Sequence, residues 1–136
     1  MGQKKETEAL KCPHALFGIE CGKGWKDLYQ PIIHYIEDYN KDKEGDDKIE
    51  ILQIKEKFGG LRFYTNFVTQ ELTDMIDEAE TKSYHTCEAC GRYIKAPIIE
   101  NHWIYSECQE CHNEWKLRRE EAFKKIQDKM DKKTLK

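Results

Sequence analysis

The stretches CEAC (87–90) and CQEC (108–111) place four cysteines in two C-x2-C hooks, with seventeen residues between the hooks. Two residues between cysteines let both thiolates of a hook point at one ion from a tight turn. Two hooks complete a tetrahedral shell of four sulfurs, which leaves no position open for water or substrate. The spacing predicts one structural Zn²⁺ held by Cys87, Cys90, Cys108 and Cys111. Four unliganded cysteines, or a redox role for them, are the alternatives.

The composition indicates a small domain whose stability depends partly on a bound metal. The chain has 136 residues, of which 36% are charged and 38% hydrophobic, so its core is modest. The net charge of −3 argues against a generally basic nucleic-acid binder, yet residues 115–136 carry nine Lys/Arg and four Asp/Glu. The net charge of this segment is therefore +5, which leaves a net charge of −8 for residues 1–114. We expect one binding surface at the C-terminal end to be basic.

The sequence also predicts the cellular compartment in which the protein acts. No apolar stretch approaches the ~20 residues that a membrane span needs, and the polar start is no export signal. Cysteines spaced as metal hooks, without such a signal, predict a reducing cytoplasm and no membrane contact. A disulfide framework is the alternative.

The chain is expected to form an α+β protein in three parts. We predict a disordered tail (1–11), a helix, β-hairpin and helix (12–84), and a C4 zinc module with a basic C-terminal helix (85–136). Apolar residues at three- and four-residue steps predict a helix from Trp25 to about Asn40, in which Pro31 can cause a kink or a later start. Period-two alternation predicts strands near 49–57 and 61–67 around a Gly59-Gly60 turn.

In this hairpin, Ile49, Ile51 and Gln53 are expected on one face, with Leu52 and Ile54 on the other. The remaining elements expected are a helix from about Thr69 to Ser83 with an acidic outer face, a second hairpin between the cysteine hooks, and a final helix from about Gln109 to Lys132.

The order hook, hairpin, hook, helix is typical of a treble-clef zinc module, in which the last two ligands come from the first turn of a helix. Four thiolates around Zn²⁺ leave a net charge of −2, and amide dipoles at a helix start stabilise negative charge. The sequence therefore predicts a treble-clef-like module.

Residues 72–111, from LTDMIDEAE through YHTCEACGRYI to ECQEC, resemble the C4 finger of the DksA/TraR family of RNA-polymerase-binding regulators. The long coiled coil with an acidic tip, which carries that family's activity, has no counterpart in residues 1–71. The resemblance implies a shared finger and no shared activity.

FGIECGKGW (17–25) and IKEKFGGLRFYT (54–65) resemble a group of small proteins encoded by bacteriophages and bacterial genomes that end in a cysteine-rich segment. This resemblance spans most of the chain. It implies a phage or prophage setting, with the host cytoplasm as the location, and supplies no reaction.

Two surfaces are candidate binding sites. One is a polar strand face beside a glycine backbone that suits a phosphate, formed by Lys55, Lys57, Gly59, Gly60, Arg62 and Tyr64; the alternative is a solvated outer face. The other is the basic final helix, with Lys116, Arg118, Arg119, Lys124 and Lys125 among its cations. Such a helix can hold phosphates through counterion release, or dock a partner protein, or serve solubility alone.

Two further constellations are weaker. Cys12, His14 and Cys21, with His34, could form a second metal site but lack hook spacing. ENHW (100–103) and CQECHNEWK (108–116) echo the HNH nuclease pattern, which would make His102 a general base and His112 a ligand of a catalytic metal. The seventeen-residue gap is short for that fold.

The sequence favours a non-catalytic, zinc-stabilised binding or regulatory protein that acts on a host or phage macromolecule, with a protein as the expected partner. A nucleic-acid-binding zinc-finger protein is the first alternative, and a compact HNH-like nuclease is the second.

Overall fold

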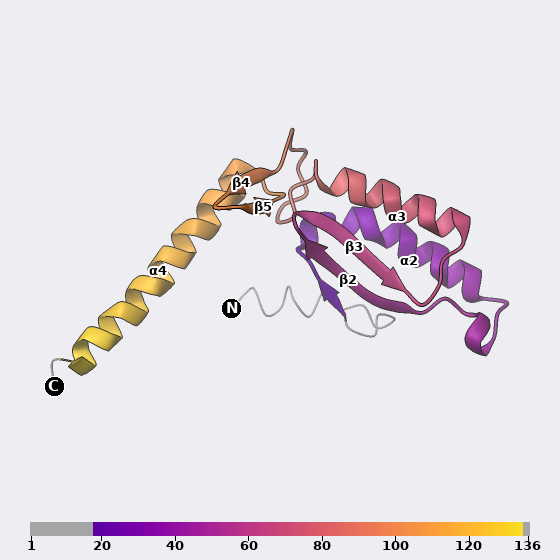
Figure 1. The fold of residues 1–136 in the computed structure, drawn as a ribbon, viewed down its shortest axis with the longest axis horizontal. Helices are drawn as coiled ribbons and strands as arrows, with labels where there is room; N and C mark the ends of the chain where they lie inside the picture. Colours follow the sequence, from indigo (N-terminus) through magenta and orange to yellow (C-terminus); the bar gives the residue numbers. More distant parts are fainter. Residues whose placement is uncertain (1–17, 135–136) are drawn as a thin grey trace.

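The computed structural model describes residues 18–134 and has the expected α+β architecture (Figure 1). A three-stranded sheet backed by two helices is followed by a two-stranded hairpin and a long final helix. The tail predicted for residues 1–11 lies outside the described residues. The elements are β1 (Ile19–Glu20), the 3₁₀ turn η1 (Lys23–Trp25), α2 (Lys26–Asn40), the 3₁₀ turn η2 (Gly45–Asp47), β2 (Ile51–Lys57), β3 (Gly60–Thr65), α3 (Gln70–Ser83), β4 (Ile98–Glu100), β5 (Trp103–Tyr105) and α4 (Gln109–Thr134).

Helix α2 forms where its apolar periodicity predicts, and it runs through Pro31. Proline removes the N–H that would bond to the carbonyl of Asp27. Both residues are exposed, so water can take the place of the missing donor. The opposite face of the helix buries Tyr29, Ile32 and Ile36, which explains why the helix persists despite the proline.

The alternation expected in β2 is wrong at one point, because Leu52 forms a β-bulge. Ile51 pairs with Thr65 and Gln53 pairs with Tyr64, so one extra residue stands on the β2 side. A bulge shifts the alternation by one position. As a result Ile51 and Ile54 are both buried, and Gln53 leaves the face on which it was expected.

The turn of this hairpin also differs from the prediction by one residue. Lys57 pairs with Gly60, and the two turn residues are Phe58 at φ 53° and Gly59 at φ 78°. Two central residues with positive φ make a tight two-residue turn whose twist matches the strands. Gly60 is therefore the first residue of β3, and Phe58 adopts a backbone conformation that bulky residues rarely take.

The larger apolar core lies between the sheet and the two helices α2 and α3, which cover the same face (Figure 1). Thr69 caps α3 by accepting a hydrogen bond from the Leu72 amide at 3.0 Å. The hydroxyl of Tyr35 on α2 lies 2.9 Å from the Thr69 hydroxyl, so one residue ties both helices together. The core consists of Trp25, Tyr29, Ile32, Ile33, Ile36, Ile49, Ile51, Ile54, Leu61, Phe63, Leu72 and Ala79.

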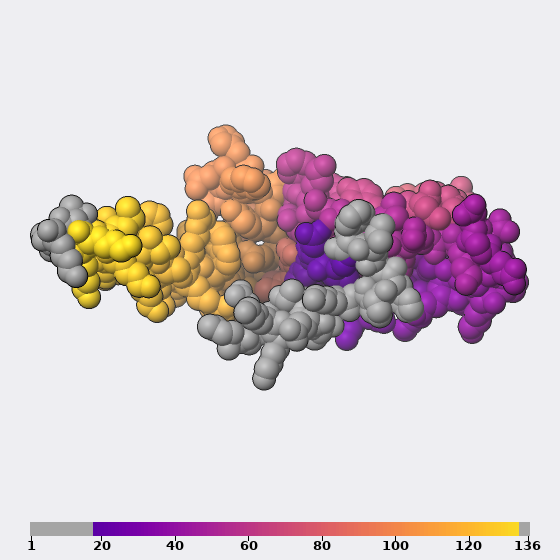
Figure 2. Space-filling view, turned by 90° about the horizontal axis from the view of Figure 1, so that it is seen from below, coloured from indigo at the N-terminus to yellow at the C-terminus, as the bar shows by residue number. Residues whose placement is uncertain are grey.

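Helix α4 leaves this body and extends into solvent as a narrow arm (Figures 1 and 2). Its 26 residues make it about 39 Å long at 1.5 Å per residue. Beyond its first turns it exposes large apolar side chains: Phe123 is 67% exposed and Ile126 is 60% exposed. No helix among residues 18–134 is both long enough and apolar enough to cross a membrane.

Candidate metal centre

The four cysteines of the two hooks meet at one point. Their Sγ atoms all lie within 4.8 Å of one another, and the Sγ atoms of Cys90 and Cys108 are 3.8 Å apart. A tetrahedral Zn–S bond of ~2.3 Å places neighbouring sulfurs about 3.8 Å apart. The cluster is therefore compatible with one metal ion, with Cys87 and Cys111 as the other two ligands.

The first hook is shaped by a small turn in the backbone. The amide of Cys87 donates to the carbonyl of Arg92 at 2.8 Å, and the amide of Gly91 donates to the carbonyl of Cys87 at 2.8 Å. Gly91 has φ +84°, a conformation that glycine adopts without a steric penalty. This closure aims both thiols of the hook inward.

The second hook coincides with the start of α4. Cys108 immediately precedes the helix, Cys111 is its third residue, and the Cys111 amide points at the Cys108 Sγ at 3.5 Å. Unpaired amides at a helix start carry partial positive charge, which stabilises thiolates there. The metal centre and the direction of α4 are thus set by the same residues.

The centre is shielded on one side only. Cys87 is fully buried and Cys108 is 7% exposed, whereas Cys90 is exposed. Burial, followed by hydrogen bonding with Cys108, raises the pKa of the Cys111 thiol well above its usual value. A bound cation reverses that direction, because it binds the thiolate and releases the proton. Four adjacent thiols in this setting suit a metal better than they suit four free side chains.

The ECGKGW segment (20–25), which is far from the first hook in the sequence, contacts that hook directly. The amide of Gly24 donates to the carbonyl of Glu88 at 2.7 Å, and the amide of Gly22 donates to the Glu88 carboxylate at 2.8 Å. The Trp25 indole donates to the carbonyl of Thr86 at 2.8 Å. A Cβ on Gly24 would collide with the backbone of the hook. Glycine is needed because two backbones touch.

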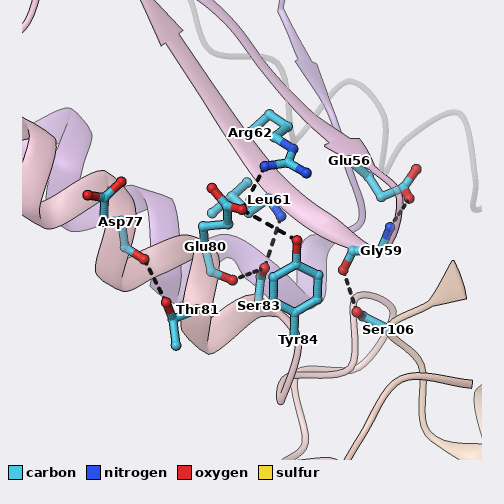
Figure 3. Close-up of polar contacts among 10 residues, drawn as sticks. All are labelled: Glu56, Gly59, Leu61, Arg62, Asp77, Glu80, Thr81, Ser83, Tyr84 and Ser106. Atoms are coloured by element: carbon cyan, nitrogen blue, oxygen red, sulfur yellow. Dashed lines mark hydrogen bonds and ion pairs between the residues drawn. The ribbon is translucent and has the colours of Figure 1, made fainter.

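The FGG turn (58–60) packs against the same module from the sheet side. A Cβ on Gly59 would collide with Ile104 of β5, and one on Gly60 would collide with Tyr84. The Ser106 hydroxyl donates to the Gly59 carbonyl (Figure 3). Both glycines are buried, so the open glycine backbone that the sequence suggested for a phosphate is absent. These glycines serve packing.

A buried polar contact joins β3 to the end of α3 beside this turn (Figure 3). The fully buried Ser83 hydroxyl accepts from the Leu61 amide at 2.9 Å and donates to the Glu80 carbonyl at 2.5 Å. The Glu80 carboxylate pairs with Arg62 at 2.6 Å. These contacts tie the sheet to α3.

The remaining residues of the predicted polar strand face do share one face. Lys55 pairs with Arg62 across the hairpin, and Tyr64 pairs with Gln53, so these side chains lie on the side away from the core. A binding role for Lys55, Lys57 and Tyr64 stays a prediction.

A cluster of carboxylates surrounds Cys21 near the ECGKGW contact. Burial raises the pKa of the Cys21 thiol to about 12, with Glu88 and Glu56 adding to the effect. Burial also raises the pKa of Glu88 to about 7, and the Gly22 amide opposes that shift. Cys21 is therefore a neutral thiol packed beside the core.

No second metal cluster forms among residues 18–134. The four hook cysteines are the one group there whose ligand atoms converge. Cys12 and His14 of the second predicted site lie outside the described residues. His34, on the exposed side of α2, lies 3.2 Å from Gln30.

The two histidines of the nuclease pattern occupy different environments. His102 is exposed in the β4–β5 turn at φ 68°. His112 on α4 is 1% exposed, its Nδ1 lies 3.0 Å from Glu107, and its ring packs against Tyr105 and Trp115. Its Nε2 lies 3.5 Å from Glu100 without hydrogen-bond geometry. This buried histidine anchors α4 to the hairpin, a role that spacing alone did not reveal.

The cations of the predicted basic helix divide into two groups. Lys116 pairs with Glu100 at 3.2 Å, Arg118 pairs with Glu114 at 3.4 Å, and Arg119 lies 5.3 Å from the Trp115 ring centroid. Lys124 and Lys125 are exposed and make no ion pair within the described part of the chain. The second group is available to a partner.

Comparison with known proteins gave no match: no family model, no curated protein and no solved structure is significantly similar to the chain. The two resemblances noted in the sequence stay predictions. The function has to follow from the chemistry of this chain's own surfaces.

Proposed function

We propose that the protein is a non-catalytic binding factor of the phage or prophage type, acting in the host cytoplasm, in which a structural zinc presents α4 to a protein partner. The observation that carries the proposal is the position of α4. Its first turns contact the metal centre and the β4–β5 hairpin, and its later turns extend away from the body with Phe123 and Ile126 exposed. Exposed apolar patches on soluble proteins commonly mark interaction sites.

Three features support zinc and a structural role for it. Four sulfurs at tetrahedral separation match a closed four-cysteine site, which has no position for a substrate. The order of first hook, β4–β5 hairpin, second hook and helix supports the treble-clef-like module that the sequence predicts. The amides of Gly22 and Gly24 brace the first hook, and such outer contacts hold ligands in place.

Nucleic acid is the second candidate, and the observation that favours it is the unpaired charge on α4. Lys124 and Lys125 are exposed cations without ion pairs among the described residues. Against it stands the charge of −8 on residues 1–114, which repels a phosphate backbone approaching the body. A compact nuclease has less support, because His112 is buried between two carboxylates and is not open to substrate.

The test is affinity capture with the zinc-loaded protein from a bacterial lysate at physiological salt, with and without nuclease treatment. We expect a specific protein to be retained after nuclease treatment. The variant Phe123→Ser/Ile126→Ser should lose it, and the control Leu117→Ser, which alters an apolar residue 58% exposed elsewhere on α4, should keep it. Loss of every captured protein after nuclease treatment would instead support the nucleic-acid candidate, and metal-dependent DNA cleavage that His112→Ala abolishes would support the nuclease.

A further inference from the structure

A pocket of about 390 Å³ lies where the β2–β3 turn meets β5, next to the two cysteine hooks. Its walls include Phe58 of the turn, Trp103 and Tyr105 of β5, Glu88 of the first hook and Glu107 before the second hook. Neither the hook cysteines nor the residues of α4 line it. Its volume falls in the range of ~300–1,000 Å³ that is typical of ligand sites. The pocket is therefore a separate site from the metal centre and from the arm.

Three carboxylates line the pocket, and internal contacts hold each of them in place. Glu56 accepts a hydrogen bond from the Gly59 amide at 2.8 Å (Figure 3), and Glu107 lies 3.0 Å from Nδ1 of His112. Glu88 is held by the ECGKGW segment. Each contact uses one oxygen, and the second oxygen of each carboxylate has no partner within residues 18–134. These second oxygens are available to a donor that enters the pocket.

The pocket is negatively charged. Lys57 is the one cation among its lining residues in the described part of the chain, and its Nζ lies 5.7 Å from the centroid of the Phe58 ring. The pKa of Glu88 is raised to about 7, chiefly by burial and further by the charges of Glu56 and Glu107. Above that pH the pocket holds three negative charges against one positive charge, so its electric field favours a cation.

The aromatic walls favour the same kind of occupant. Phe58 is 63% exposed and Trp103 is 65% exposed, so neither ring contributes much to the core. Phe58 also holds φ 53°, a conformation that asparagine or glycine adopts more readily in such a turn. The face of an aromatic ring carries partial negative charge and attracts cations. The rings and the carboxylates therefore act on one occupant in the same sense.

The spread of the carboxylates distinguishes between kinds of cation. Within residues 18–134, only the four hook cysteines bring three or more ligand atoms to within 4.8 Å of one another, so the three carboxylates are too far apart to share one metal ion. An ammonium group is a compact point charge. A guanidinium is planar, stacks on aromatic rings and has five N–H donors that can reach separate carboxylates. The pocket therefore suits a guanidinium best.

The exposed rings also bear on the source of the guanidinium. A free arginine would fill the hollow but would leave the outer faces of Phe58 and Trp103 in water. An arginine within a protein segment would fill the hollow while its neighbours covered those rings. Aromatic residues and arginine are both enriched in protein–protein interfaces.

We propose that this pocket receives an arginine side chain of a partner protein, with the guanidinium against Trp103 and its N–H groups on the second oxygens of Glu56 and Glu107. The inference goes beyond the proposed function, because it names a second binding site. It does not require that α4 bind the same partner.

A set of matched peptides tests this chemistry. The probe is a seven-residue peptide with a central arginine flanked by leucines, added to zinc-loaded, ¹³C-labelled full-length protein at pH 8, where Glu88 is ionised. Methyl and aromatic NMR signals of Phe58, Trp103 and Ile104 should shift, with a dissociation constant on the order of 1 mM for one anchoring side chain. No shift, or shifts confined to other parts of the protein, would overturn the inference.

Three comparison ligands separate the possible occupants. The same peptide with citrulline, which has the shape of arginine without its charge, should bind at least tenfold more weakly. The same peptide with lysine should bind at least threefold more weakly. Equal binding of the citrulline or lysine peptide would contradict recognition of a guanidinium. N-acetylarginine amide should bind more weakly than the arginine peptide, and equal binding would point to a small guanidinium ligand instead of a protein.

Variants then locate the site. Glu56→Gln removes one charge but keeps an acceptor for the Gly59 amide, and Trp103→Ala removes one aromatic wall. Each should weaken binding of the arginine peptide at least fivefold. The matched controls are Glu50→Gln, an exposed carboxylate just before β2, and Ile99→Ala, an apolar residue of β4 that is 72% exposed. Neither lines the pocket, and both should stay within twofold of the parent protein.

Parent-like binding by Glu56→Gln and Trp103→Ala, or equal losses in the two controls, would overturn the inference. Circular dichroism shows whether each variant is folded, and Glu56→Gln keeps the test decisive if Trp103→Ala unfolds, because it changes charge and not volume. Failure here would leave the proposed role of α4 standing, because no residue of α4 lines this pocket.

Discussion

The body and the α4 arm are stabilised in opposite ways. In the body, glycine backbones, a buried serine and an apolar core lock the sheet, the helices and the metal hooks together. In α4, the first turns contact other elements through Glu110, His112, Trp115 and Lys116, and the later turns extend away from the body (Figure 1). Most helical stability in proteins comes from tertiary packing, and the later turns of α4 have little of it among the described residues.

This difference separates stability from binding. Residues that hold the body together are buried and tolerate little change. The exposed residues of α4 can vary without a large loss of stability, so they can be adapted to a binding partner. The metal centre joins the two regions, because it closes the body and fixes the start of α4. Substitutions in the body, at the centre and on the arm should therefore have effects of very different size.

The largest effect should come from the metal centre. Cys108→Ser should reduce bound zinc below one per chain and unfold residues 85–134, because metal-binding energy on the order of 10 kcal/mol is folding energy at such a site. Elemental analysis and circular dichroism with and without a chelator provide the measurement. If the variant or the chelated protein keeps its full helix content, the centre is not a folding element.

The next largest effect is expected at the contact between the ECGKGW segment and the first hook. Gly24→Ala places a methyl group against the backbone carbonyls of Cys87 and Glu88, and should lower the free energy of unfolding by roughly 3 kcal/mol. The control is Gly45→Ala, where space is open and only the positive φ is unfavourable, at a cost of about 1 kcal/mol. Equal losses in urea unfolding would show that the two backbones are not locked together.

A smaller, pH-dependent effect is expected at Glu88, whose pKa is raised to about 7, chiefly by burial. The folded protein holds this proton at pH values where the unfolded chain, with a pKa near 4.5, has released it. Stability therefore falls as pH rises from about 4.5 to 7.

Glu88→Gln removes the ionisable carboxyl, and with it the pH-dependent loss of stability, but keeps an acceptor for the Gly22 amide. The variant should exceed the parent by about 2 kcal/mol at pH 8, and the gain should vanish towards pH 5. Urea unfolding of both proteins across this range gives the measurement. A gain that is independent of pH would exclude Glu88 as the titrating group.

The smallest effect on stability should come from the arm. Phe123→Ser/Ile126→Ser changes two exposed side chains and should alter the free energy of unfolding by less than about 0.5 kcal/mol, while it removes capture of the partner protein. Thermal unfolding and affinity capture with the same samples separate stability from binding. A large loss of stability would mean that Phe123 and Ile126 pack against the body. The body and the arm would then not differ in how they contribute to stability.

Much of the fold could be predicted because its signals are local. Helices α2 and α3 followed from three- and four-residue periodicity, and α4 followed from the cysteine hook at its start. The bulge at Leu52 and the turn at Phe58 could not be predicted, because they depend on the pairing register with β3. Alternation in a single strand carries no information about its partner.

The sequence by itself determined which cysteines lie together within each hook, since two intervening residues bring both thiols of one hook to the same turn. Only the tertiary structure decided the packing role of the glycines and the role of His112 in anchoring α4. Gly24, Gly59 and Gly60 meet backbone or side chains far away in the chain, and His112 is enclosed by Glu107, Tyr105 and Trp115. The physical reason is that close packing is a property of surfaces in contact, and these surfaces come from segments that the sequence keeps apart.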